Sequence, residues 1–96
     1  PGWHLEIRAD LETRDGKRIR FVYDYGEGEA VFHAPDPEVD EARRRTVYRG
    51  ENGDLRIVVE IEGTPCQDTM SGEEFESTVT VEFLGRIFPG CGRALH

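Results

Sequence analysis

The side chains best suited to chemistry lie in the last third of the chain. Cys66 and Cys91 bracket a segment that also holds the single methionine, Met70. A pair of cysteines forms a disulfide, sits buried as two thiols in a reducing compartment, or performs redox chemistry. Acidic side chains close to Cys66 disfavour a reactive thiolate. We therefore predict a structural disulfide, and keep buried thiols and a redox pair as the alternatives.

The strand pattern brings these two cysteines to the same end of a sheet. If the Leu84-Gly85 pair forms the centre of a hairpin turn, Thr78 faces Cys91 across an antiparallel pair of strands. Cys66 follows the strand that we expect to pair with the Thr78 strand, so it comes close to Cys91. A disulfide here would contribute about 3.5 kcal/mol in the chain-entropy account. It would also indicate an oxidising compartment.

Other residues offer weaker starting points for chemistry. None of the three histidines has metal-ligand spacing, so a metal site would need two of them to meet near Met70 or Asp68. Ser71 with Asp68 and a distant histidine could form a nucleophile. A Ser-Gly turn whose aspartate bonds its own backbone is the commoner arrangement. We therefore expect binding or a structural role, with no catalytic residue, metal or cofactor.

Composition excludes several classes of partner. The 96 residues carry 12 Lys and Arg against 20 Asp and Glu, a net charge of -8. Such a balance argues against nucleic acid and anionic lipid. It is typical of a plain solvated surface or a salt-tolerant source, and a basic protein steered to the surface by its charge is the alternative. No apolar run is long enough to span a membrane. The chain starts at Pro1 without a methionine, as after signal-peptide removal or a cloning choice, so we expect any lipid anchor to precede these residues.

Alternating apolar residues predict short strands throughout the chain. Asp15-Gly16 and Asn52-Gly53 are hairpin signals, and Pro35 and Pro37 interrupt the pattern. Residues 38–45 are expected to form one helical turn or a loop. The predicted strands cover residues 3–7, 19–25, 30–34, 46–48, 55–61 and 78–83, and a seventh starts at residue 86.

This spacing predicts an all-β fold, a small antiparallel meander barrel or sandwich of six to eight strands with one disulfide. Residues 1–96 form a single β domain. The expected core consists of Trp3, Leu5, Ile7, Phe21, Tyr23, Leu55, Ile57, Val59, Ile61, Val79, Val81 and Phe83.

Two stretches resemble a family of small bacterial envelope proteins, predicted lipoproteins or membrane proteins whose function is unknown. They are Cys66-x-Asp68-x-Met70-Ser71-Gly72 and Gly90-Cys91-Gly92, and Trp3 corresponds to a tryptophan in the family's first strand. The resemblance implies a secreted β-domain that is periplasmic or anchored to the outer membrane by a lipid. It implies no known activity.

A second resemblance is to the periplasmic inhibitors of c-type lysozyme, small disulfide-stapled barrels. Their Ser-Gly-x-Lys/Arg-Tyr loop, which enters the lysozyme cleft, is similar to the segment from Ser71 to Phe75. Glu74 stands where the inhibitors have a base, and Phe75 where they have tyrosine. Phe83-Leu84-Gly85-Arg86 replaces their Trp-Thr-Lys-Gly. This resemblance implies an inhibitor of a basic periplasmic enzyme as the alternative function.

The loop after Cys66 is thus the candidate partner-binding segment. Met70 and Phe75 are predicted to plug the end of the barrel, with an exposed contact surface as the alternative. The candidate residues are Asp68, Met70, Ser71, Glu73, Glu74 and Phe75.

Overall fold

A computed structural model describes residues 2–12 and 16–92, and its regular elements are β-strands apart from one 3-10 turn. The strands are β1 (His4–Ala9), β2 (Lys17–Tyr23), β3 (Gly28–Ala34), β4 (Glu38–Asp40), β5 (Arg45–Asn52), β6 (Leu55–Glu62), β7 (Cys66–Gln67), β8 (Glu74–Phe75), β9 (Ser77–Phe83) and β10 (Arg86–Gly92), and the turn is η1 (Asp24–Gly26).

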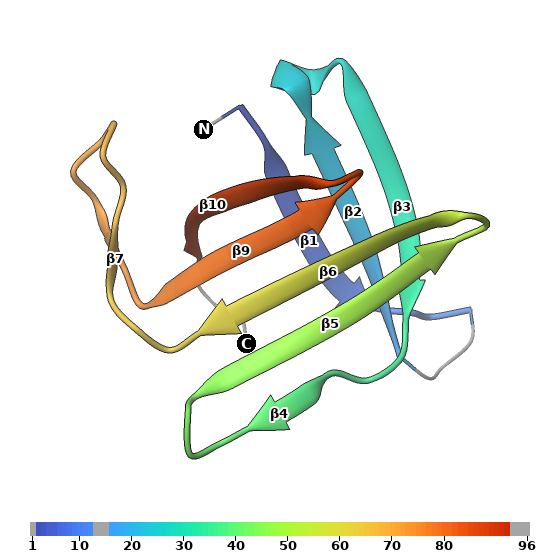
Figure 1. The fold of residues 1–96 in the computed structure, drawn as a ribbon, viewed down its shortest axis with the longest axis horizontal. Coiled ribbons are helices and arrows are strands. Elements are labelled where there is room, and N and C mark those ends of the chain that lie inside the picture. The colour runs from blue at the N-terminus through green and yellow to red at the C-terminus, as the bar shows by residue number, and fades with distance from the viewer. Residues whose placement is uncertain (1, 13–15, 93–96) are drawn as a thin grey trace.

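Eight of these strands form one curled antiparallel sheet. Its order is β1-β2-β3-β5-β6-β9-β10, with β4 also paired to β5, while β7 and β8 form a separate two-stranded sheet. Figure 1 shows the first three strands crossing behind the four long strands β5, β6, β9 and β10. The result is a half-barrel. The predicted all-β antiparallel fold is therefore confirmed.

The sheet turns its corner between β3 and β5. These two strands share one residue pair, His33 with Glu51, and the Ala34-Pro35-Asp36-Pro37 segment follows at once. β4 then pairs with the same edge of β5. The two prolines lack amide hydrogens, so they divide what would otherwise be one strand. The loop or helical turn predicted for residues 38–45 is correct only for residues 41–44, because β5 offers 38–40 a free edge.

Tight turns set the register of the later strands. Phe83 faces Arg86 and Thr78 faces Cys91, as predicted. Leu84 and Gly85 have φ angles of 51° and 72°, the positive values that a type I′ turn requires.

The first hairpin and the end of β2 differ from the sequence prediction. Ala9 pairs with Lys17, and this register excludes a two-residue turn at Asp15-Gly16 as the link between β1 and β2. Asp15 itself lies outside the described residues. β2 ends at Tyr23, and Tyr25, predicted to continue it, belongs to η1.

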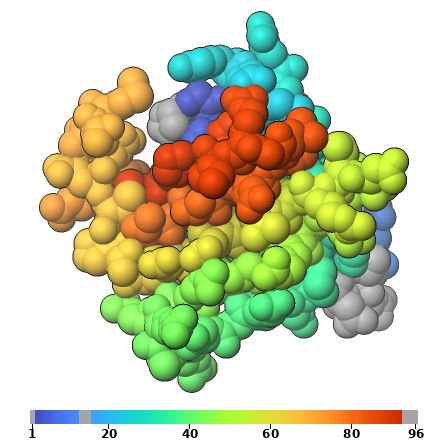
Figure 2. All heavy atoms as spheres, in the orientation of Figure 1, coloured from blue at the N-terminus to red at the C-terminus, as the bar shows by residue number. Residues whose placement is uncertain are grey.

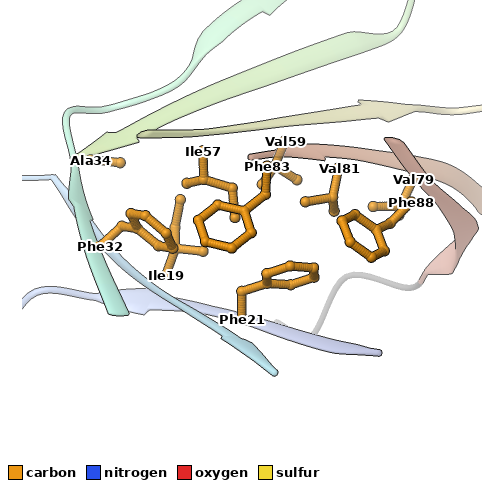
Figure 3. Packing of buried hydrophobic residues seen from close by; sticks show 10 residues of the cluster. All are labelled: Ile19, Phe21, Phe32, Ala34, Ile57, Val59, Val79, Val81, Phe83 and Phe88. Atoms are coloured by element: carbon orange, nitrogen blue, oxygen red, sulfur yellow. The ribbon is translucent and has the colours of Figure 1, made fainter. Parts of the chain in front are cut away.

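The core fills the space between the two halves of the curled sheet. Phe21 and Phe32 reach across from β2 and β3 to Phe83 on β9, each with ring centroids 5.6 Å apart (Figure 3). Leu55 was predicted to be buried but is exposed, because it sits beside the β5–β6 turn. The core also contains residues that the prediction omitted: Ile19, Phe32, Ala34 and Phe88. Val47 is buried outside this cluster.

β1 and β10 are the two end strands of the sheet and are not paired with each other. Trp3 covers the core on the side between them. Its ring lies 6.0 Å from that of Phe21 and 6.4 Å from that of Phe88. A Cβ atom at Gly90 would lie 2.5 Å from Cζ2 of Trp3, so only glycine leaves room for the indole. A Cβ at Gly92 would lie 2.7 Å from Cγ2 of Val79. Packing thus explains both glycines of the Gly-Cys-Gly segment.

Candidate functional site

The two cysteines form the predicted disulfide. Cys66 opens β7 and Cys91 lies near the end of β10, with their Cα atoms 5.5 Å apart. Because side chains alternate along a strand, Cys91 points to the face opposite that of the buried Phe88. The disulfide therefore joins β10 to the base of the β7–β8 hairpin without entering the aromatic core.

The segment from Cys66 to Phe75, here called the stapled hairpin, projects from the body of the molecule (Figures 1 and 2). Cys66 pairs with Phe75 and Gln67 with Glu74 at its base. Asp68 then organises the tip: its Oδ1 accepts the amide of Met70, and its carbonyl accepts the amide of Gly72. The hairpin thus has its own hydrogen-bond network.

Further bonds complete the tip of the stapled hairpin. The amide of Asp68 donates to the carbonyl of Glu73, and Ser71 Oγ accepts the amide of Glu73. The side-chain amide of Gln67 donates to the carbonyl of Gly72. Gly72 has a φ of 72°, a value that glycine adopts without strain. Because its polar groups are hydrogen-bonded within the hairpin, the tip holds one shape, and binding a partner costs little further conformational entropy.

All six candidate residues lie on the stapled hairpin, but they differ in exposure. Met70 is 82% exposed, so the prediction that it plugs the barrel end is wrong. The hairpin carries its tip away from the core, which leaves the Met70 side chain exposed. Phe75 and Asp68 are half-buried, while Ser71, Glu73 and Glu74 are exposed.

Negative charge is concentrated in the part of the sequence that contains the stapled hairpin. Between Ile57 and Gly85 the sequence contains no lysine or arginine. The rest of the chain carries 13 of the 20 acids and all 12 bases, so it is close to neutral. The seven acids of this segment are Glu60, Glu62, Asp68, Glu73, Glu74, Glu76 and Glu82. This separation of acids from bases can be read from the sequence, and it gives the candidate partner surface a negative charge.

One of these acids is held by a base from a neighbouring strand. Arg45 Nε donates to Glu60 Oε1 at 2.8 Å across the β5–β6 pair. This hydrogen bond lowers the pKa of Glu60 and raises the pKa of Arg45. The stapled hairpin contains no lysine or arginine, so any base that meets its carboxylates comes from another part of the chain or from a partner.

Two of the three histidines lie among the described residues, and each contacts a nearby acid. His4 bonds Glu6 and His33 Nδ1 bonds Asp10 Oδ2, whereas Ser71 Oγ accepts the amide of Glu73. Glu6 has a lowered pKa because of its bond with His4. In this part of the chain no three His, Cys, Asp or Glu side chains gather as metal ligands. His96 lies outside the described residues.

A shallow polar hollow of about 290 Å³ lies at the β3–β5 corner. His33 and Glu51 line it, and Asn52 Nδ2 donates to the carbonyl of Val31 beside it. The hollow is open to solvent. Its polar side chains connect the weakly paired β3 and β5.

Comparison with known proteins found no relative of this chain. No protein-family model, curated protein or solved structure matches this chain. Among the described residues, no helix has the length and apolar character needed to cross a membrane.

Proposed function

We propose that this chain is a bacterial cell-envelope β-domain that binds a basic protein through the stapled hairpin and performs no catalysis. The observation that carries the proposal is the exposed Met70 at the tip of a disulfide-held hairpin with an acidic border. An unbranched thioether adapts to varied apolar pockets, and such side chains recur at binding surfaces. The disulfide supports a periplasmic or outer-membrane-anchored location.

Preorganisation supports binding by this segment. An extended loop that orders on binding loses rotamer and backbone freedom, which weakens association. Here the disulfide fixes the base of the hairpin, and hydrogen bonds from Asp68 and Ser71 fix its tip. A partner therefore meets a surface that is already in one shape.

Charge supports a basic partner. The segment between Ile57 and Gly85 carries seven acids and no base, so it accounts for almost all of the net charge of -8, and three of these acids lie on the stapled hairpin. Complementary charge raises association rates and selects partners more than it adds affinity. Met70 would then supply the apolar contact, while Glu73 and Glu74 on the border steer the approach.

Site-specific photo-crosslinking in the periplasm tests this proposal. A photoreactive residue at Met70 should capture one defined basic protein. The same residue at Leu11, which is 87% exposed on the β1–β2 loop, should not capture it. No adduct at position 70, or the same adducts at both positions, would contradict binding by the stapled hairpin.

Inhibition of c-type lysozyme is the second candidate function. It is favoured by the placement of Ser71 and Gly72 at the exposed tip of a hairpin that projects from the body of the molecule (Figure 2). A cell-wall lysis assay at low and moderate salt decides it, with Ser71→Ala and Glu74→Lys beside the unaltered protein. Inhibition that Ser71→Ala weakens supports this function, and no inhibition at micromolar protein removes it.

A further inference from the structure

Two arginines face each other across the first pair of strands. Arg8 on β1 is the register partner of Arg18 on β2, and both are exposed. Ile19, the next residue along β2, points into the core (Figure 3), so alternation places both arginines on the outer face of the sheet. Like charges placed directly opposite one another destabilise a strand pair. Folding stability therefore does not explain why two arginines stand here.

The described acids leave much of this positive charge without a partner. Among residues 2–12 and 16–92, Arg18 forms no ion pair, whereas Arg20 on the same strand contacts an acid of β3 at 3.1 Å. Arg8 Nη2 lies 3.5 Å from Glu6 Oε2. The other oxygen of Glu6 lies 3.2 Å from His4 Nε2. Within the described chain, the two opposed guanidinium groups thus have one carboxylate between them, and a histidine shares it.

The same row of side chains continues onto β3. Arg18 is also the register partner of His33. Asp10, two residues beyond Arg8, bonds His33 Nδ1 through its Oδ2 at 2.8 Å. Arg18 and His33 both line the open hollow of about 290 Å³. The Arg18 side chain therefore has an arginine as its neighbour on β1 and borders an open space.

We propose that Arg8 and Arg18 together bind the phosphate group of a small molecule. A guanidinium donates two parallel hydrogen bonds to a pair of oxygens on a phosphate or a carboxylate. A tetrahedral phosphate has several such pairs, so it accepts one arginine from each strand at the same time, whereas a carboxylate has a single pair. A phosphate monoester also carries a charge of about -1.5 to -2 at neutral pH. Such a group between the two arginines replaces their repulsion with attraction.

Charge favours a small ligand over a polymer. The whole chain has a net charge of -8, which disfavours nucleic acid and anionic membranes. The two arginines belong to the part of the chain outside Ile57 to Gly85, where 12 bases nearly balance 13 acids. At physiological ionic strength, charges further away than about 8–10 Å are largely screened. A single phosphate group therefore responds mainly to the arginines that it touches.

Titration of the whole protein with inorganic phosphate, followed by amide NMR, tests the site. Sodium chloride at the same ionic strength of about 0.1 M is the reference. Phosphate should shift the amides of residues 6–9 and 17–19 and saturate with a dissociation constant of about 1 mM or lower. Acetate, with its single pair of oxygens, should bind about tenfold more weakly. Glycerol 3-phosphate distinguishes the source: tighter binding than inorganic phosphate supports an esterified ligand, and weaker binding supports the free ion.

Substitutions assign the binding to the two arginines. Arg8→Gln and Arg18→Gln should each weaken phosphate binding by about tenfold or more, the usual effect of removing a charged hydrogen-bond donor. Arg18→Lys keeps the charge but loses the paired donors, so its affinity should be intermediate. Arg43→Gln is the matched control, because the Arg43 side chain is 77% exposed, as is that of Arg8, and it also contacts one acid. Arg43→Gln should leave phosphate binding unchanged.

Urea unfolding in the absence of phosphate shows whether these variants remain folded. Arg18→Gln should not lower the midpoint, since it removes a like-charge opposition. A lowered midpoint would assign Arg18 a structural role and overturn the proposal. So would the absence of a saturable shift beyond that of sodium chloride, equal affinities for acetate and phosphate, or an equal loss of binding with Arg43→Gln and Arg18→Gln.

Discussion

Removal of the Cys66–Cys91 disulfide should cost this small domain a large part of its stability. The two cysteines are 25 residues apart in sequence. In the chain-entropy account, a crosslink of this length restricts the unfolded state by about 3.5 kcal/mol. A domain of this size has a total free energy of unfolding of roughly 5–10 kcal/mol. The Cys66→Ser/Cys91→Ser variant should therefore fold, but only marginally.

Urea unfolding measures this loss, with the fluorescence of Trp3 as the probe. Trp3 is the only tryptophan and lies against Gly90, one residue from Cys91. With a urea slope of roughly 1–1.5 kcal/mol per molar, the midpoint should fall by about 2–3 M. Reductant should move the unaltered protein to the midpoint of the variant and leave the variant unchanged.

Two results would refute this reasoning. A loss below about 1 kcal/mol would mean that the crosslink hardly restricts the unfolded chain. A loss of the expected size with no response of the unaltered protein to reductant would assign the effect to the serine substitutions instead. The matched pair of measurements separates these cases.

Three further changes test individual contacts. Gly90→Ala should destabilise the fold by about 1–3 kcal/mol in urea unfolding, because the new Cβ meets the Trp3 indole, and an equal stability would contradict the packing. Leu84→Asn should raise the free energy of unfolding by about 0.5–1 kcal/mol, since asparagine tolerates a φ of 51° better, and a fall would argue against the type I′ turn. The hydrogen bond from Arg45 lowers the pKa of Glu60. The stabilisation from this bond is therefore present above the ordinary pKa of 4.5, and it is lost as the pH falls through the lowered pKa of Glu60. Glu60→Gln should remove about 0.5 kcal/mol at neutral pH and flatten this acid dependence, and an unchanged pH profile would show that the bond contributes nothing.

The later strands were predictable because local chemistry determines them. A two-residue turn at Leu84-Gly85 fixes which residues face each other, and that register places Thr78 opposite Cys91. The disulfide follows from the same arithmetic. Alternation also identified the buried faces of β6 and β9, because each of these strands has one face toward the core.

The rest of the fold depends on how the sheet curls, and local sequence patterns do not predict that curl. Ile19, Phe32 and Phe88 are buried because β1, β2 and β3 cross behind β5, β6, β9 and β10. Leu55 fits the alternation but lies beside a turn, where the core no longer covers it. The strand at residues 38–40 exists because β5 has a free edge beyond the two prolines.

The candidate surface was predictable in its residues but not in its exposure. The sequence singled out Met70 and Phe75 as the apolar members of the loop, and its acids are plain to see. Whether a methionine in a stapled loop turns inward or outward depends on the direction in which the loop leaves the sheet. The separation of seven acids from every base was the signal available from the sequence alone.

The central claim is that a basic partner binds the stapled hairpin, and charge reversal tests it most directly. The measurement is the periplasmic crosslinking yield at position 70 in a Glu74→Lys background and in a Glu27→Lys background. Both residues are exposed acids, but Glu27 follows η1 and is not part of the stapled hairpin. The account predicts a fall of about tenfold with Glu74→Lys and little change with Glu27→Lys. Equal yields in the two backgrounds would contradict it.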